Sequence, residues 1–320
     1  MAEKLIEVKN VKKYFNTKKG LLHAVDDVSF DINKGETLGV VGESGCGKST
    51  TGRVVLRLLE ATEGEVLFEG ENILKYSPEK MREMRKQMQI VFQDPFASLN
   101  PRLSVSEIIA EPLIVHKQFS NKNVMLKRIK ELMDTVGLAE RLVNTYPHEL
   151  DGGRRQRIGI ARALALNPKF IVQDEPVSAL DVSIQAQILN LMADLQDELG
   201  LTYMFISHDL SVVKHVSDNI AVMYLGKIVE LTDYKTIFAK PLHPYSQALL
   251  SAIPVPKLHS TQNRIILEGD VPSPINPPEG CRFYGRCRYR QDICKEKSPE
   301  LREIEPGHQV ACHFAGTVGV

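Results

Sequence analysis

The sequence predicts an α/β fold with a largely parallel sheet, followed by a smaller C-terminal part. Stretches typical of strands alternate with stretches typical of helices, which is the pattern of such folds. A glycine-rich loop joins one predicted strand to one predicted helix, and a helix N-terminus of this kind binds anions. The amino-acid composition changes near residues 236–240, because ten of the 17 prolines lie from Pro241 onward. A domain boundary is therefore expected there.

The first part of the chain is predicted to consist mainly of strands. Three of them share β-branched or alternating residues and cover 5–11, 24–32 and 37–41. Lys34-Gly35 is a turn signal between two of these strands. Residues 65–74 predict a hairpin, and residues 88–95 predict a short strand that ends in a turn with proline.

Helices dominate the middle of the chain. Leu126, Ile129, Leu132 and Met133 recur on one face of a helix within residues 104–145. Further helices are expected after residue 152 and in an amphipathic stretch that Gly200 closes. The remaining predicted strands alternate with these helices and lie in 169–176, 201–209 and 219–231.

Composition restricts the possible functions. Of 320 residues, 43% are hydrophobic and 25% are charged, which is ordinary for a globular protein. Lys plus Arg and Asp plus Glu are both 40, so nothing indicates a nucleic-acid partner. No apolar run approaches about 18 residues, and the charged N-terminus lacks a signal-peptide core. We therefore expect a cytoplasmic protein that reaches a membrane only through a partner.

The stretch "GESGCGKST" carries the pattern G-x-x-x-x-G-K-[ST]. Its glycines let backbone amides surround phosphates, its lysine neutralises the β- and γ-phosphate oxygens, and its serine binds Mg²⁺. A chance match in a chain of this length has a frequency of about 1%, so a plain glycine turn is the weaker interpretation. The predicted ATP-binding residues of this phosphate loop are Gly42, Glu43, Ser44, Gly45, Cys46, Gly47, Lys48, Ser49 and Thr50.

Two carboxylates follow the predicted buried strand in "KFIVQDEP", at the strand end where α/β folds bind ligands. Asp174 is predicted to serve Mg²⁺, and Glu175 to polarise the water that attacks the γ-phosphate. Alone, this pair would indicate a solvated turn, but the phosphate loop favours the catalytic interpretation. Gln93 and His208 also end predicted strands. By themselves they would be an ordinary loop residue and an incidental histidine, although His208 follows the next strand of the same predicted sheet and could reach the same cleft.

In this order and spacing, the motifs resemble those of the ATP-binding subunits of ABC transporters over residues 4–235. The phosphate loop is similar to the Walker A motif, "FIVQDE" to Walker B, and "LDGGRRQR" occupies the place of the ABC signature. The single residues that match family motifs are Gln93 of the Q-loop, the switch histidine His208, Asp181 of the D-loop and Tyr14, the aromatic residue that stacks on adenine.

The resemblance implies roles for these residues. The implied catalytic residues are Lys48, Gln93, Glu175 and His208, and the implied Mg²⁺ ligands are Ser49, Gln93 and Asp174. It also implies a P-loop ATPase domain over 1–236, with a mixed central sheet, an N-terminal antiparallel β layer and a helical subdomain at about 94–160. A small Cys-rich extension over 237–320 would follow.

Two further stretches narrow the resemblance to one branch of the family. "QDPFASLNPRLSVSEIIAEPL" and "HPYSQALLSAIP" are similar to oligopeptide/dipeptide importers, and "SLNPR" to the F-type partner of an unlike ATPase pair. The resemblance implies ATP hydrolysis that powers peptide import at the cytoplasmic face of a membrane. The implied partners are a second, non-identical ATPase subunit, two transmembrane permease subunits that dock around residues 93–110, and, indirectly, an external peptide-binding protein.

The signature departs from the family pattern Leu-Ser-Gly-Gly-Gln, because this chain has Asp151 and Arg154 around Gly152 and Gly153. The glycines still allow the backbone to approach a partner's ATP. One interpretation is that Asp151 only caps the helix that follows. The other is electrostatic: a carboxylate about 4 Å from a phosphate charge costs ~1 kcal/mol in water and ~4 at an effective dielectric of 20. Arg154 and Arg155 would offset part of that cost.

Four of the five cysteines lie in the C-terminal part, at Cys281, Cys287, Cys294 and Cys312. Stable disulfides are rare in the cytoplasm, so the thiols indicate a metal site that holds a loop-rich segment. Zinc sites usually contain a tight C-x₂₋₄-C pair, which is missing, whereas iron–sulfur clusters accept varied spacing. The resemblance implies a [4Fe–4S] cluster, with Zn²⁺ or free thiols as the alternatives. Cys46, inside the phosphate loop, is expected to have no chemistry of its own.

Two other functions remain open at this point. A soluble ABC ATPase of translation or DNA repair usually carries two ATPase halves or a coiled-coil insertion, and neither is visible here. A regulatory subunit that binds ATP and hydrolyses it weakly is suggested by Asp151, although Glu175 and His208 argue against it.

Overall fold

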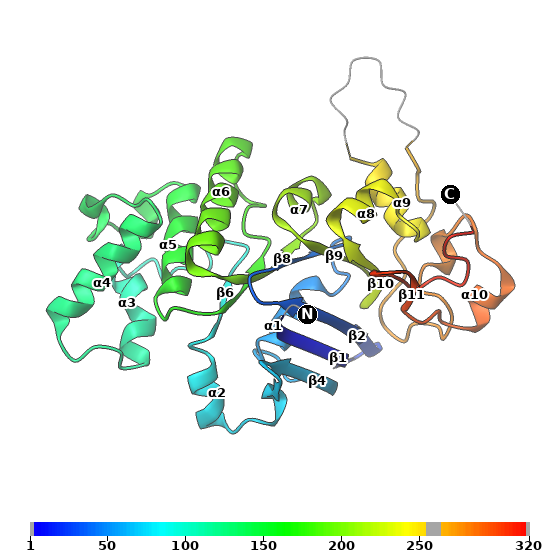
Figure 1. Cartoon of the computed structure of the whole chain (residues 1–320), viewed down its shortest axis with the longest axis horizontal. Helices are drawn as coiled ribbons and strands as arrows, with labels where there is room; N and C mark the ends of the chain where they lie inside the picture. The colour runs from blue at the N-terminus through cyan, green and yellow to red at the C-terminus, as the bar shows by residue number, and fades with distance from the viewer. Residues whose placement is uncertain (1–2, 254–263, 318–320) are drawn as a thin grey trace, which may run out of the picture. The chain divides into compact units, whose positions relative to one another are not determined.

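The computed structural model describes residues 3–253 and 264–317, which form two compact units (Figure 1). The first unit combines Met1–Lys75 with Phe205–Val320, and the second is Tyr76–Met204. The predicted boundary near residues 236–240 is not a border of either unit, and it stays a prediction. The last part of the chain thus belongs to the same unit as the first.

The first unit contains most of the strands. Its strands are β1 (Lys4–Thr17), β2 (Gly20–Asn33), β3 (Thr37–Val41), β4 (Glu63–Phe68), β5 (Glu71–Asn72), β9 (Asn219–Tyr224), β10 (Lys227–Asp233), β11 (Arg302–Glu305) and β12 (His308–Val310). Its helices are α1 (Lys48–Val55), η1 (Ile73–Lys75), α7 (Leu210–Val216), α8 (Tyr234–Ala239), α9 (Pro244–Ser251), η4 (Tyr284–Arg286) and α10 (Asp292–Glu296). Strand β8 (Thr202–Ser207) spans the border between the units.

One sheet of the first unit is antiparallel, with the strand order β2-β1-β4-β5. Strands β1 and β2 pair along nearly their whole length, from Lys4 opposite Asn33 to Thr17 opposite Gly20. In a strand, alternate side chains point to the same face, so the alternating apolar residues of β1 and β2 face the core. Ile6 of β1 and Val28 of β2 are fully buried. This sheet confirms the predicted antiparallel N-terminal layer.

The other strands of the first unit form part of a mixed sheet, in the order β11-β12-β10-β9-β3. Strands β3 and β9 are parallel and almost completely buried, which explains their unbroken apolar sequences. Strand β10 is antiparallel to both of its neighbours, β9 and β12, and β12 is antiparallel to β11. The sheet is therefore mixed, because the chain turns back at Gly226 and two C-terminal strands extend the sheet, β12 beside β10 and β11 beside β12.

The second unit is mainly helical. Its helices are α2 (Pro78–Met84), α3 (Val105–Val115), α4 (Lys122–Thr135), η2 (Glu140–Leu142), η3 (Pro147–Glu149), α5 (Gly152–Leu164) and α6 (Val182–Leu199). Its strands β6 (Met88–Val91) and β7 (Phe170–Asp174) are parallel. A capping box of Ser104 and Glu107 starts α3, which packs against α4 and α5.

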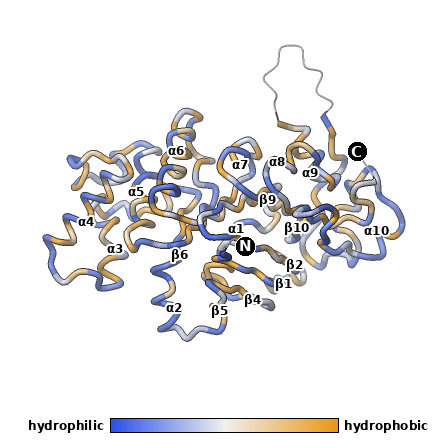
Figure 2. Tube along the Cα trace, viewed as in Figure 1, coloured by the Kyte–Doolittle hydropathy of each residue, from blue (hydrophilic) through white to orange (hydrophobic). Residues whose placement is uncertain are grey.

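The predicted apolar face of α4 is buried with one exception. Ile129, Leu132 and Met133 are at most 3% exposed, but Leu126 is 40% exposed. The hydropathy colouring of Figure 2 shows such apolar stretches along strands and helix faces, between hydrophilic turns. In the described part of the chain, none of the helices combines the length and the apolar character that a membrane span requires.

Candidate nucleotide-binding site

The phosphate loop lies between β3 and α1 and has a backbone that only glycine can adopt at its two ends. Gly42 has φ 153° and Gly47 has φ 104°. A Cβ atom on Gly42 would lie 2.2 Å from the Met223 carbonyl oxygen, and one on Gly47 would lie 2.2 Å from that of Ala24. The two glycines of the sequence pattern are thus fixed by sterics, before any ligand is considered.

Lys48 supplies a buried positive charge at the start of α1. Lys48 is buried, with 4% of the residue exposed. Its Nζ donates to the carbonyl oxygens of Gly42 (2.7 Å) and Glu43 (3.0 Å). No side chain caps the N-terminus of α1 at Gly47. A helix start without a cap, a nearby ammonium group and a glycine loop together favour a phosphate ligand.

Neighbouring elements of the first unit hold this loop in place. The Glu43 amide donates to the Tyr245 hydroxyl (2.9 Å), and the Gly226 amide donates to the Cys46 carbonyl oxygen (2.7 Å). Burial raises the pKa of the Cys46 thiol, so it stays protonated at neutral pH. This environment suits a small filling residue.

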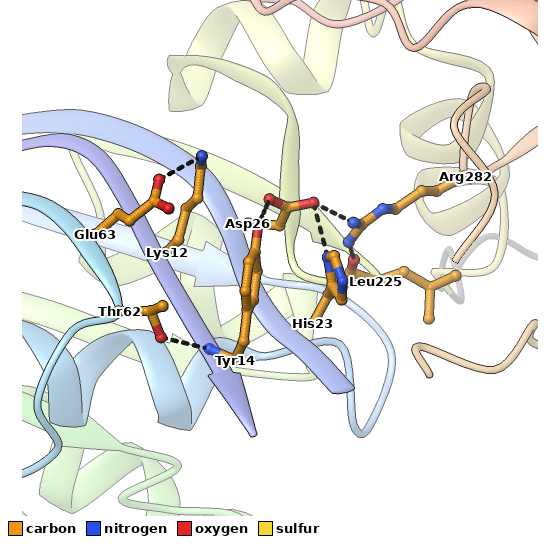
Figure 3. A network of polar contacts seen from close by, with 8 residues as sticks. All are labelled: Lys12, Tyr14, His23, Asp26, Thr62, Glu63, Leu225 and Arg282. Carbon is orange, nitrogen blue, oxygen red and sulfur yellow. Dashed lines mark hydrogen bonds and ion pairs between the residues drawn. The ribbon is translucent and has the colours of Figure 1, made fainter. Parts of the chain in front are cut away.

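Tyr14, the predicted adenine-stacking residue, lies on β1 and is part of a polar network (Figure 3). Its ring lies 4.1 Å from the His23 ring, centroid to centroid, and its hydroxyl donates to Asp26 Oδ1 at 2.5 Å. Asp26 also forms an ion pair with Arg282. The sequence indicated Tyr14, but it did not indicate Asp26 or Arg282.

The second unit carries the predicted acidic residues. Asp174 ends β7 and is 2% exposed, and Glu175 follows it with φ 48°. Gln93, which comes soon after β6, donates through Nε2 to Glu175 Oε2 at 2.9 Å. The structure thus brings together Gln93 and Glu175, which lie 82 residues apart in the chain. Their predicted roles are not tested by this contact.

The predicted site residues are divided between the units. The phosphate loop, Tyr14 and His208, which follows β8, belong to the first unit; Gln93, Asp174, Glu175, the signature and Asp181 belong to the second. Each unit therefore presents one half of the predicted constellation.

Asp151 is the N-cap of α5, as one of the two interpretations of the sequence predicted. Its Oδ1 accepts from the Arg154 amide (2.8 Å), and its Oδ2 pairs with Arg154 Nη1 (3.1 Å). Arg155 does not share this charge: it is buried, donates to the Pro147 carbonyl oxygen and stacks over the Phe96 ring. The expectation that Arg155 offsets the Asp151 charge is therefore wrong, because α5 turns that side chain inward.

The signature glycines have a packing role that the sequence did not indicate. A Cβ atom on Gly153 would lie 2.7 Å from Ile184 Cγ2, and one on Gly152 would lie 3.0 Å from Leu180 Cδ2. Leu180 belongs to the D-loop stretch, and Asp181 is the N-cap residue of α6, without a side-chain cap bond. The glycines thus let the start of α5 approach the start of α6.

The four C-terminal cysteines line one small cavity of about 20 Å³, room for a single water. Burial, with a smaller contribution from the neighbouring thiols, raises the pKa of Cys281 to about 11, so this thiol is protonated at neutral pH. Within residues 3–253 and 264–317, no group of three or more His, Cys, Asp or Glu side chains is placed to hold a metal ion. The predicted metal site is therefore not confirmed.

A groove on the second unit offers an apolar surface. It has a volume of about 510 Å³ and lies between α3 and α4, where Ile114, Val115 and Leu126 are exposed. Large exposed apolar patches of this kind often bind another protein.

Two family profiles match the chain. The profile described as ABC transporter matches residues 25–178, and that described as oligopeptide/dipeptide transporter, C-terminal region, matches residues 229–294. The second match includes Cys281, Cys287 and Cys294.

Curated relatives match over the whole length. The chain is 54% identical to the oligopeptide transport ATP-binding protein AppF of Bacillus subtilis, over 98% of each chain. It is also 54% identical to OppF of the same organism, over 98% of this chain and 97% of the relative. Among solved structures, the dimeric bacterial ABC transporter cassette MJ0796 has a TM-score of 0.66 and 31% identity, over 72% of this chain and 99% of the cassette.

Proposed function

Because this chain belongs to the ATP-binding subunits of ABC transporters and is an ATPase of that family, we propose that its ATP hydrolysis powers the import of di- or oligopeptides across a membrane. The observation that carries the proposal is the phosphate loop, with buried Lys48 behind two sterically required glycines. The near full-length similarity to oligopeptide transport proteins supports the choice of cargo.

The proposed chemistry assigns roles to residues of both units. Lys48 and the loop amides bind the β- and γ-phosphates, Ser49 and Asp174 bind Mg²⁺, and Tyr14 stacks on adenine. Glu175 polarises the attacking water. Gln93, which donates to Glu175, would also help to hold Mg²⁺, and the ion would neutralise charge on the phosphates.

The proposed switch residue and D-loop complete this assignment. His208 contacts the γ-phosphate, and Asp181 contributes to the interface with a second ATPase subunit. Both assignments rest on the positions of these residues directly after β8 and at the start of α6.

We propose that a second, non-identical ATPase subunit completes each nucleotide site. The start of α5, with Asp151, Gly152 and Gly153, would face the ATP held by the partner's phosphate loop. A carboxylate there repels the phosphates, so the site that includes this signature would be weaker than the other. The proposed pair is therefore asymmetric.

The proposed location is the cytoplasmic face of the membrane, through two transmembrane permease subunits. The groove between α3 and α4 suits an apolar segment of a permease, because Ile114, Val115 and Leu126 are exposed around it. An external peptide-binding protein would deliver the cargo and would not touch this chain.

We also keep the [4Fe–4S] cluster as a proposal, and Cys281, Cys287, Cys294 and Cys312 would hold it. The four thiols line one cavity, and a cluster spreads its four thiolates over separate irons, unlike a single zinc ion. Its contribution would be structural, as a cross-link of the extension. An anaerobic preparation should be brown, absorb near 400 nm and lose iron in Cys294→Ser; a colourless, iron-free preparation would reject the cluster.

A regulatory subunit that binds ATP but hydrolyses it weakly is the second candidate, and only Asp151 favours it. Single-turnover hydrolysis in the assembled transporter separates the two functions. Rapid cleavage of one ATP per ATPase pair that depends on Glu175 supports the first candidate.

The main test is Lys48→Ala in the complex of both ATPases and both permeases, reconstituted in vesicles. The variant should lose ATP binding at this loop, and peptide uptake should fall by at least about a hundredfold, since a buried phosphate-binding charge is lost. Lys240→Gln, which removes a surface ion pair with Glu305, is the matched control. Unchanged uptake in Lys48→Ala would refute the proposal.

A further inference from the structure

Five consecutive residues of the C-terminal extension, Arg282–Arg286, lie between Cys281 and Cys287 and contact the predicted nucleotide-binding parts of the same unit. Arg282 is 8% exposed and Phe283 is 2% exposed, so the segment is anchored and not a surface loop. Residues Tyr284–Arg286 form the short helix η4. The two arginines at the ends of the segment reach different parts of the site.

Arg282 reaches Tyr14 through one buried carboxylate (Figure 3). Its Nη2 donates to Asp26 Oδ2, and the other Asp26 oxygen accepts the Tyr14 hydroxyl. Its Nη1 donates to the Leu225 carbonyl oxygen. The guanidinium fork therefore fixes Asp26 against the turn between β9 and β10 and, through Asp26, the Tyr14 ring.

The charges in this network support one another. Burial would raise the pKa of Asp26, but the Tyr14 hydrogen bond and the Arg282 charge outweigh it and keep this pKa below the usual value. Burial and the same hydrogen bond raise the pKa of Tyr14, which keeps its hydroxyl protonated and able to donate. Removing one partner of a buried ion pair leaves the other charge buried without compensation, which strongly destabilises the fold. The charged form of Asp26 therefore requires Arg282 beside it.

Arg286 contacts the phosphate loop directly. Its Nη1 lies 2.8 Å and 3.1 Å from the two carboxylate oxygens of Glu43, the second residue of the loop. The side chains are 9% and 27% exposed, so water screens the pair only in part. Burial lowers the pKa of Arg286, but the hydrogen bond to the Glu43 carboxylate and its charge raise this pKa by more, so the guanidinium stays charged.

Phe283 gives the segment its rigid position. Its ring packs edge-on against Tyr224 at 5.2 Å and lies 5.5 Å from the Tyr245 ring. Tyr245 in turn accepts the Glu43 amide, so the same loop residue is held at its backbone and at its carboxylate. An aromatic cluster of this kind has a defined geometry, which transmits position from the extension to the loop.

We propose that this segment completes the nucleotide site of its own chain: Arg282 positions the Tyr14 ring through Asp26, and Arg286 neutralises Glu43 and fixes the phosphate loop. Both are positioning residues, and neither touches the nucleotide. The inference rests on the proposed function, because it takes Tyr14 and the loop as the parts that bind adenine and phosphate. The extension thus controls how tightly the chain binds ATP.

The test compares two ligands of the purified full chain by calorimetric titration with Mg²⁺: ATP and inorganic tripolyphosphate, which has no base. Arg282→Met should weaken ATP binding about fivefold to tenfold, since an aromatic stack on the base is lost in part, and leave tripolyphosphate binding unchanged. Arg286→Met should weaken both ligands about fivefold, because an unpaired Glu43 carboxylate repels phosphates.

Three controls separate positioning from general stability. Adding Glu43→Gln to Arg286→Met removes the repelling charge and should restore the tripolyphosphate affinity. His308→Gln breaks another buried pair of the extension, with Glu230, away from the loop, and should lower the thermal midpoint without changing either affinity. If Arg282→Met does not fold, Tyr14→Phe replaces it in the test, because this substitution alters no charge. The affinity for ATP must then fall, and the affinity for tripolyphosphate must stay unchanged.

The outcomes distinguish the inference from the function on which it rests. If Lys48→Ala binds ATP as well as the wild type does, the proposed function fails. If binding depends on Lys48 but the Arg282 and Arg286 variants bind both ligands like the wild type, only the inference is overturned. Equal loss of both ligands in Arg282→Met would also overturn it, because that pattern reports general damage.

Discussion

At the residue scale, the burial of His243 makes the stability of the fold depend on pH. It is 2% exposed and is the N-cap of α9, where its Nδ1 accepts the Tyr245 amide at 3.0 Å. Burial lowers its pKa to about 4, although the nearby Glu230 carboxylate acts in the opposite direction. The neutral ring is therefore part of the fold, because protonation would abolish the cap.

The free energy of unfolding should fall as the pH drops from about 6.5 to about 4. In this window the unfolded chain binds a proton that the folded chain does not, and the slope reaches about 1.4 kcal/mol per pH unit, or about 3 kcal/mol in total. Above pH 6.5 the contribution is complete. Urea titrations at several pH values measure it.

His243→Asn is the matched control, because asparagine caps a helix but does not titrate. The variant should lose the His243 share of the pH dependence. Identical slopes for variant and wild type would contradict the prediction.

At the scale of an element, the phosphate loop owes its shape to the backbone around it. Gly47 lies against the Ala24 carbonyl oxygen, and Gly42 lies against that of Met223, so β2 and β9 impose the loop geometry. The two glycines of the pattern G-x-x-x-x-G-K-[ST] are therefore required because the fold leaves no room for a Cβ atom there, as well as for phosphate binding.

Gly47→Ala should abolish ATP binding, because its Cβ would lie 2.2 Å from a backbone oxygen that cannot move without shifting β2. Gly35→Ala is the control: it has φ 76°, and its Cβ would meet nothing within 4 Å. It should cost about 1 kcal/mol of stability through left-handed strain alone and leave ATP affinity unchanged. Calorimetric titration and thermal unfolding measure both effects. Similar affinities in the two variants would show that the steric argument fails.

At the scale of the whole molecule and its assembly, Asp151 should affect ATP turnover at the nucleotide site that contains the phosphate loop of the partner ATPase subunit. Asp151→Ser and Asp151→Asn both keep the α5 cap and remove the charge. Either should raise the ATPase turnover of the assembled transporter about fivefold or more, since a repulsion of the partner's ATP disappears.

Steady-state phosphate release from the reconstituted complex, with both ATPase subunits present, measures this effect. Unchanged or lower turnover in both variants would refute the proposed asymmetry. A gain in Asp151→Ser alone would assign the effect to the serine hydroxyl and not to the charge.

The same scale explains why the C-terminal extension is not a separate appendage. Strand β12 pairs with β10, and His308 forms a buried pair with Glu230, so the extension shares the core of the first unit. The prolines of this part belong to irregular backbone, and irregular backbone can still pack on a sheet. The domain boundary that their number suggested stays a prediction.

Local features of this protein can be predicted from its amino-acid sequence. Many strands and helices, the phosphate loop, the α5 cap at Asp151 and the α6 stop at Gly200 follow from patterns that span a few residues, whereas α10, β11 and β12 were not predicted. Such patterns carry their own physical cause, because periodicity, capping and left-handed turns depend on neighbours in the chain. The family resemblance added the order of motifs.

Contacts between residues far apart in the chain become visible in the folded structure and cannot be predicted from local patterns. Arg282 and Asp26 are 256 residues apart, and Arg286 and Glu43 are 243 apart, so no local pattern records either pair. The inward turn of Arg155 and the return of the extension to β10 are of the same kind. Their cause is the burial of charge and apolar surface from separate parts of the chain, which exists only once the chain has folded.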